Sequence, residues 1–132
     1  MKYILDTHAF LWALFNPDKL SKATIQTIIS QENSIAVSVI TFWEISLKYS
    51  IGKLDLSGIK PDDLPGFANK TGFEIAQISP DEVATFYKLP RLGHRDAFDR
   101  LLIWQAIQQK RILISKDNSF NEYKDYGLQM HW

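Results

Sequence analysis

The sequence predicts an α/β fold on a parallel sheet, because short apolar runs alternate with helical patterns along the chain. The run at residues 3–5 leads directly into a helical stretch, and so does the run at residues 34–38. With 132 residues, 45% of them hydrophobic, the chain can bury one full core. We therefore expect a single domain over residues 1–132, with right-handed crossovers between its strands.

The first half of the chain reads as strand, two helices, strand and helix. The first helix covers residues 8–15 and stops at Asn16-Pro17, and the second starts near Ser21. Its expected inward side chains are Ala23, Ile25, Ile28 and Ile29. After the strand at 34–38, a helix is expected from Thr41 to about Ser50, with Gly52 as its stop.

The second half begins with the least regular segment, residues 54–66, and its clearest signals are two helix starts. Ser79 and Glu82 form a capping box with Pro80 at the first helical position, and this helix ends by Leu89. Asp96 is the expected N-cap of a helix that begins at Ala97. The other expected elements are a weak helix at 63–71, strands at 73–78, 111–115 and 128–131, and a helical turn at 119–123.

Charge and composition limit the possible functions. The 15 basic and 15 acidic residues give no net charge, so nucleic-acid binding would depend on a local basic patch. The absence of cysteine excludes disulfide scaffolds, thiolate zinc sites and cysteine nucleophiles. No stretch resembles a signal peptide or a membrane span, and we expect a cytoplasmic protein without membrane contact.

Four acidic residues occupy positions that a parallel sheet brings to one edge, where strands end and helices begin. They are Asp6, Glu44, Asp99 and Asp117, and Asp99 falls in the first turn of the helix capped by Asp96. Each has a structural alternative as a cap or first-turn acid; Glu44 could complete a capping box from Thr41 or pair with Lys48 one turn later. Together, however, clustered carboxylates repel unless a cation neutralises them, and this predicts a metal.

Oxygen ligands favour Mg²⁺ or Mn²⁺, which can turn a bound water into a nucleophile and stabilise charge on phosphorus. Metal-assisted phosphodiester hydrolysis is the chemistry that follows. The basic residues near the acids could hold phosphates, or they could be ordinary solvated charges; they are Arg91, Arg95, Arg100 and Lys116. His8 and His94 flank acidic positions and could orient substrate or water, or be structural.

Other catalytic classes are less favoured. No nucleophile elbow surrounds Ser38 or Ser115, and no glycine-rich phosphate loop is present. A haloacid-dehalogenase-type phosphatase needs a second Asp at the position of His8, and a receiver domain needs an Asp where Ile78-Ser79 stands.

Four segments resemble, in order and spacing, the PIN-domain toxins of the VapC type. These segments are residues 3–8, 38–45, 94–106 and 114–120. The resemblance implies a three-layer α/β/α sandwich with a central parallel sheet of four to five strands. It also implies a Mg²⁺- or Mn²⁺-dependent endoribonuclease, the toxin of a toxin–antitoxin pair, acting on RNA as a homodimer whose active-site groove receives an antitoxin tail. The acidic quartet of the family falls on Asp6, Glu44, Asp99 and Asp117, all as metal ligands and catalytic residues.

Weaker expectations concern substrate, partner and departures from the family. The residues expected to contact substrate are His94, Arg95, Arg100, Ser115 and Lys116. The apolar side chains that could form a partner surface, or equally core, are Phe10, Leu11, Trp12, Leu14, Phe15, Phe42 and Trp43. Two positions depart from the family: Ala97 stands where many relatives have Pro, and Ser115 stands where they commonly have Thr. Neither departure removes one of the four acids. The alternative function is a catalytically idle PIN-like module that binds RNA or protein.

Overall fold

The computed structural model describes residues 1–132 and contains a five-stranded, fully parallel sheet. The strands are β1 (Lys2–Leu5), β2 (Ser34–Ser38), β3 (Glu74–Ala76), β4 (Ile112–Ile114) and β5 (Met130–His131). Their order is β3-β2-β1-β4-β5, so the chain winds outward from β1 on one side and then on the other. Ligands of such sheets bind beyond the carboxyl ends of the strands where the order reverses, which here is beside β1. The predicted fold class is confirmed.

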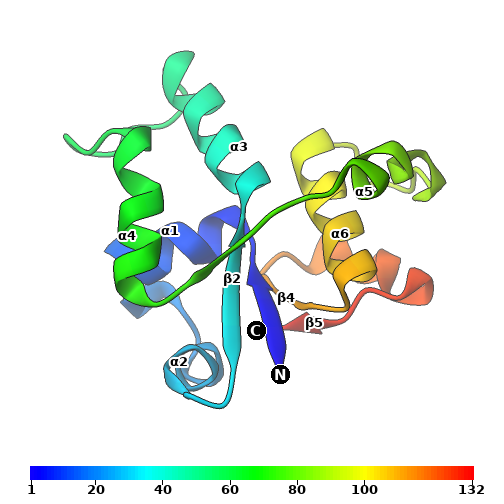
Figure 1. Ribbon diagram of the computed structural model, residues 1–132, viewed down its shortest axis with the longest axis horizontal. Helices are drawn as coiled ribbons and strands as arrows, with labels where there is room; N and C mark the ends of the chain where they lie inside the picture. The colour runs from blue at the N-terminus through cyan, green and yellow to red at the C-terminus, as the bar shows by residue number, and fades with distance from the viewer.

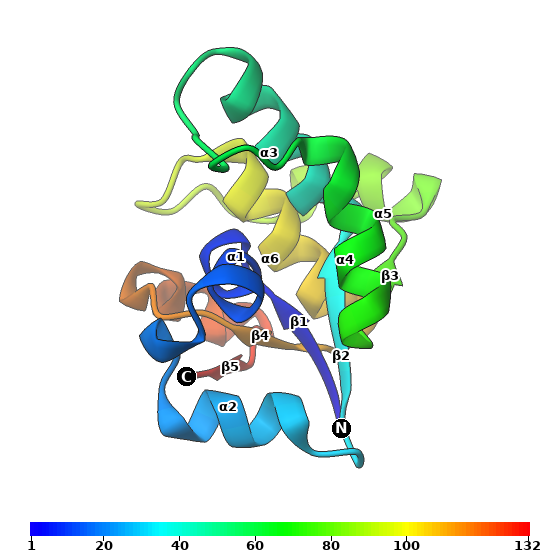
Figure 2. The same cartoon turned by 90° about the vertical axis from the view of Figure 1, so that its left-hand side faces the viewer.

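Helices cover both faces of the sheet. The α-helices are α1 (Thr7–Phe15), α2 (Lys22–Ile29), α3 (Val39–Ser50), α4 (Leu64–Thr71), α5 (Pro80–Ala84) and α6 (Ala97–Gln109). The 3₁₀ segments are η1 (Pro17–Lys19), η2 (Pro61–Asp63), η3 (Phe86–Lys88) and η4 (Asn118–Tyr126). Helices α1, α2 and α4 lie on one side of the sheet and α5 and α6 on the other, while α3 rises beyond its carboxyl edge (Figures 1 and 2).

The core has two halves, one on each face of the sheet. On β1, Tyr3 and Leu5 pack with side chains of α1 and α4, whereas Ile4 between them packs with side chains of α6. This alternation with burial on both faces explains why the strands read as continuous apolar runs. None of the helices has the length and apolar character needed to cross a membrane.

Helix α3 begins earlier than the sequence predicts. Ser38 caps it by accepting a hydrogen bond from the Ile40 N–H at 3.0 Å, so Val39 is already helical. The alternative of a capping box between Thr41 and Glu44 is therefore not realised, and Glu44 lies in the second turn rather than the first. In α2, Ala23 and Ile29 are exposed rather than inward.

Two other elements are shorter than predicted. Strand β3 ends at Ala76, because the next carbonyl, that of Gln77, accepts from the side chains of Gln105 at 3.2 Å and Gln109 at 3.0 Å. The capping box of Ser79 and Glu82 is present, but α5 is only five residues long and passes into η3.

Candidate functional site

Asp6 lies at the end of β1 and caps α1. Its Oδ1 accepts a hydrogen bond from the Ala9 N–H at 2.8 Å, and the residue is only 7% exposed. Burial raises the pKa of Asp6 to about 6, against the lowering effect of hydrogen bonds from Ser115 and Ala9; the charge of Asp99 adds to the rise. Asp99, 93 positions later in the chain, therefore lies near enough for its charge to act on Asp6.

Asp96 and Asp99 divide the roles at the start of α6. Asp96 accepts the Asp99 N–H at 3.0 Å and is the helix cap, as predicted. The Asp99 side chain instead lies with its Oδ2 2.7 Å from Nε2 of His94. Burial raises the pKa of Asp99, as do the charges of Asp96 and Glu44, while the hydrogen bond from His94 opposes the rise.

Glu44 is buried, and both of its carboxylate oxygens are engaged. Thr7 donates its hydroxyl to Oε1 at 2.6 Å, and the Lys48 ammonium contacts Oε2. The pairing with Lys48, which the sequence offered as a structural role for Glu44, is thus present. The bond to Glu44 raises the pKa of Lys48 even though partial burial opposes the rise, and the charges of Asp96 and Asp99 contribute.

Asp117 caps η4 and is linked to Asp99 through two side chains. Its Oδ1 accepts from the N–H and the hydroxyl of Ser119, at 2.9 and 2.7 Å. The Ser119 hydroxyl lies 3.1 Å from Nδ1 of His94, whose other nitrogen contacts Asp99. Burial raises the pKa of Asp117, but the hydrogen bonds from Ser119 and the charges of His94 and His8 outweigh it and hold that pKa below its usual value.

The four acids therefore lie at one edge without forming a closed ligand set: no three Asp, Glu or His side chains converge as metal ligands would. Their oxygens suit a hard cation by chemistry. Mg²⁺ keeps several waters and is usually held by only one or two carboxylates. The arrangement fits a hydrated ion bound at an open edge, with Asp6 and Asp99 as the two carboxylates whose pKa burial raises.

A buried polar link holds the helices that carry these acids. Ser38, at the start of α3, donates its hydroxyl to Oε1 of Gln105 on α6 at 2.5 Å, and both residues are fully buried. The sequence places Gln105 only on the apolar face of its helix. A polar residue inside such a face was the available signal for this link.

Three of the residues expected to contact substrate lie in different surroundings. Arg100 donates to the Leu89 carbonyl at 3.1 Å and lies 4.8 Å from the Phe86 ring, so its guanidinium packs against the chain itself. Ser115 is buried and accepts from the Asp117 N–H at 3.0 Å, so its hydroxyl supports the acids. Lys116 is exposed and lines, with Asp6, His8, Trp12, Asp117 and Asn118, a hollow of about 390 Å³.

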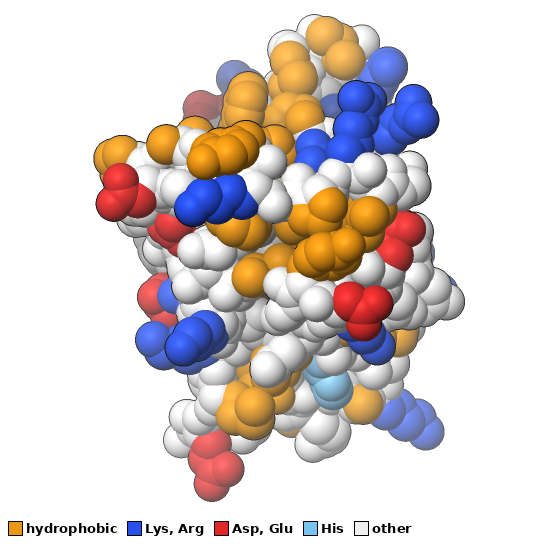
Figure 3. Space-filling view, turned by 90° about the vertical axis from the view of Figure 1, so that its right-hand side faces the viewer, with side chains coloured by type: hydrophobic (Ala, Val, Ile, Leu, Met, Phe, Trp, Pro, Cys, Tyr) orange, Lys and Arg blue, Asp and Glu red, His pale blue; other side chains and the backbone are white.

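Other basic side chains lie on the outside of the same end. Arg91 and Arg95 are exposed. Figure 3 shows the face that carries α5 and α6, where several Lys and Arg side chains lie together at the upper end, toward which the strands point in Figure 1. The chain thus offers a local basic patch despite its zero net charge.

The apolar residues expected at a partner surface are partly core. Phe10 is fully buried and packs edge-on against Phe42, with 5.7 Å between ring centroids. Trp43, by contrast, is 60% exposed and contacts Phe98. An apolar groove of about 460 Å³ adjoins the acidic hollow through His8 and Trp12. Its other lining residues are Leu11, Phe15, Asn16, Leu54, Asp55, Leu56, Ser57 and Ile59.

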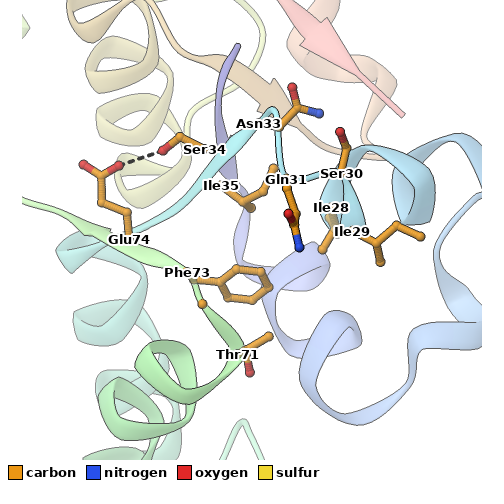
Figure 4. Close-up of a pocket in the computed structure, with 11 residues that line it drawn as sticks. Ile28, Ile29, Ser30, Gln31, Asn33, Ser34, Ile35, Thr71, Phe73 and Glu74 are labelled. Atoms are coloured by element: carbon orange, nitrogen blue, oxygen red, sulfur yellow. Dashed lines mark hydrogen bonds between the residues drawn. The ribbon is translucent and has the colours of Figure 1, made fainter.

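A smaller hollow of about 220 Å³ lies at the opposite end of the sheet (Figure 4). Its one acid, Glu74, accepts from the Ser34 hydroxyl at 2.8 Å and from Arg111 at 3.0 Å. This carboxylate is already neutralised, so the hollow lacks the unbalanced acids of the carboxyl edge.

Comparison with known proteins agrees with this fold. The family model described as PIN domain matches residues 3–126. The chain is similar to VapBC2 from Rickettsia felis in complex with promoter DNA (20% identity over 99% of this chain and 98% of that chain, TM-score 0.68). It is similar to VapBC-1 from nontypeable Haemophilus influenzae (17%, 99% and 97%, TM-score 0.67) and to VapBC-5 from Mycobacterium tuberculosis (16%, 98% and 95%, TM-score 0.58). No curated protein matches significantly. Because the family model spans nearly the whole chain, the protein belongs to the PIN domain family.

Proposed function

We propose that this protein is a metal-dependent endoribonuclease and the toxin of a toxin–antitoxin pair. PIN domains are generally nucleases. The observation that carries the proposal is the pair Asp6 and Asp99, two carboxylates that burial disfavours as anions, with the charge of Asp99 adding to the effect on Asp6. A divalent cation between them would remove this penalty, which is the reason to expect one here.

Asp6 and Asp99 would hold Mg²⁺ or Mn²⁺, with Glu44 and Asp117 beside them. Such an ion, when bound, would supply a polarised water and would neutralise charge that develops on phosphorus. His94 orients Asp99 through its 2.7 Å contact, and Ser115 fixes the backbone of Asp117. Lys116, in the same hollow as Asp6, binds a phosphate of the RNA, and Arg95 a neighbouring one.

The partner surfaces follow from the exposed apolar side chains. The groove beside Trp12 adjoins the acidic hollow, so an antitoxin segment seated there would also cover the acids. VapBC-5, one of the similar structures, belongs to the VapBC family of toxin–antitoxin systems. Trp43 and Leu47 on α3 and Ile51 at its C-cap are spaced four residues apart and are 60, 41 and 56% exposed, which supports a homodimer through this helix.

The test is cleavage of structured and single-stranded RNAs by wild type and Asp99→Asn, with Mn²⁺ and with EDTA. We expect cleavage only by wild type with Mn²⁺. Asp125→Asn removes an exposed acid without hydrogen bonds and should cleave like wild type. Cleavage that persists in EDTA or in Asp99→Asn would contradict the proposal. RNA binding without cleavage by wild type would instead favour an idle binding module.

A further inference from the structure

Lys48 is a cation built into the acidic edge. It lies one turn after Glu44 on α3, and its ammonium contacts Oε2 of Glu44 while Thr7 occupies Oε1. The charges of Asp96 and Asp99 also reach it. Of the four acids at this edge, Glu44 is therefore the one whose charge is balanced by a lysine of the same helix.

This pair differs from an ordinary ion pair on a helix surface. The Glu44 side chain is only 7% exposed, whereas that of Lys48 is 40% exposed. A buried carboxylate needs a counter-charge, but the exposed end of a lysine can leave at little cost, because its flexible stem carries a strongly hydrated ammonium. Glu44 depends on Lys48 more than Lys48 depends on Glu44.

We propose that Lys48 is the resident counter-ion of the acidic site and competes with the divalent cation for Glu44. The inference rests on the metal dependence proposed above, and it concerns how tightly the ion binds. When Lys48 holds Glu44, the ion has one carboxylate fewer and meets a nearby positive charge. When the ion binds fully, the ammonium must move away from Oε2.

Competition of this kind has two linked consequences in Lys48→Met, which keeps the apolar stem and removes the charge. Without metal, buried Glu44 loses its counter-charge, and the unfolding temperature in EDTA should fall by several degrees. With metal, the competitor is gone, and Mn²⁺ should bind about 5- to 150-fold more tightly, the range of typical couplings between two ligands.

The experiment is a calorimetric Mn²⁺ titration of the full chain, with thermal unfolding in EDTA on the same samples. Lys48→Arg keeps the positive charge and should bind Mn²⁺ like wild type. Lys70→Met is the matched control, because Lys70 is an exposed helical lysine without an ion pair. Its small gain in affinity measures the effect of removing one positive charge anywhere.

Lys48→Met binding Mn²⁺ no more tightly than Lys70→Met would overturn the proposal. Should Lys48→Met fail to fold, Lys48→Gln, which keeps a hydrogen-bond donor for Glu44, takes its place with the same expected direction. Failure of RNA cleavage with a normal Mn²⁺ titration would overturn the proposed nuclease and leave the role of Lys48 intact. No Mn²⁺ binding by any variant would overturn both.

Discussion

At the amino end of the sheet, Glu74 is half-exposed and contacts Arg111 and Ser34, whereas at the carboxyl end Asp6 is buried beside Asp99. The hydrogen bond from Arg111 lowers the pKa of Glu74, while burial raises that of Asp6. The same chemical group therefore favours folding as an anion at one end and opposes it at the other.

This difference separates structure from function within one sheet. At the amino end the charge of Glu74 is balanced by that of Arg111, as expected where only stability matters. The carboxyl end holds more acidic than basic side chains. This excess reduces stability, and proteins retain such unfavourable arrangements where function requires them. Removing a carboxylate charge should therefore have opposite effects on stability at the two ends, which Asp6→Asn and Glu74→Gln test. Changes at Ser38 and Asp96 test the frame that holds the acids, and the four predictions follow from the largest expected effect to the smallest.

Replacing Asp6 by Asn should abolish activity and stabilise the fold. Loss of a ligand that supports several kcal/mol of metal catalysis lowers cleavage by about 100-fold or more. The raised pKa means that charged Asp6 opposes folding above about pH 6 and costs nothing below about pH 4. Asn keeps the cap of α1, so the free energy of unfolding in EDTA should rise by up to about 3 kcal/mol at pH 7. Denaturant unfolding from pH 4 to 7.5 measures this, and a less stable Asp6→Asn at pH 7 would contradict it.

Replacing Ser38 by Ala should weaken the frame beneath the acids. The change removes the cap of α3 and leaves the buried Gln105 oxygen without a donor, which together lower the free energy of unfolding by about 2 kcal/mol. Ser46→Ala, at an exposed position of the same helix, is the control. Equal unfolding midpoints for the two variants would show that the link between α3 and α6 contributes nothing.

Replacing Asp96 distinguishes the cap of α6 from the proposed ligand Asp99. Asp96→Ala should lower stability by about 1 kcal/mol through the lost cap, and Asp96→Asn should keep both stability and cleavage. Chemical unfolding and RNA cleavage of both variants test this. If Asp96→Asn abolishes cleavage at unchanged stability, both acids belong to the site.

Replacing Glu74 by Gln should have the smallest effect. Its side chain is 51% exposed, so losing the charge should lower the free energy of unfolding by no more than about 1 kcal/mol. Because the pKa of Glu74 is lowered by Arg111, the contribution is present at neutral pH and is lost as pH falls through that lowered value. Cleavage should be unchanged, and a stability difference that grows toward acid pH would contradict the assignment.

Local signals in the sequence were sufficient for the alternation of strands and helices and for the caps at Ser79 and Asp96, because these depend on neighbouring residues. The start of α3 was misread because Val39 and Ile40 continue the apolar run of the strand before them. The shortness of β3 could not be predicted, since the carbonyl of Gln77 is taken by side chains from distant α6.

The position of the acids at one edge of the sheet could be predicted from where the strands end. The side chains that hydrogen-bond to these acids could not. Thr7 and Glu44 are 37 positions apart, and Ser119 and His94 are 25 apart. Contacts at these separations depend on how the elements pack, which no local pattern encodes. The pair of Glu44 and Lys48 was the exception, because both residues lie on one helix.

The pairing of β1 with β4 also determines at what point in folding the four acids can come together. Leu5 lies beside Ile114, so these two neighbouring strands come from widely separated parts of the sequence. Closing so long a loop is slow and must precede the contacts it permits. During synthesis, Asp6 is made long before Asp117, so the nascent chain has no complete site until Asp117 has been added.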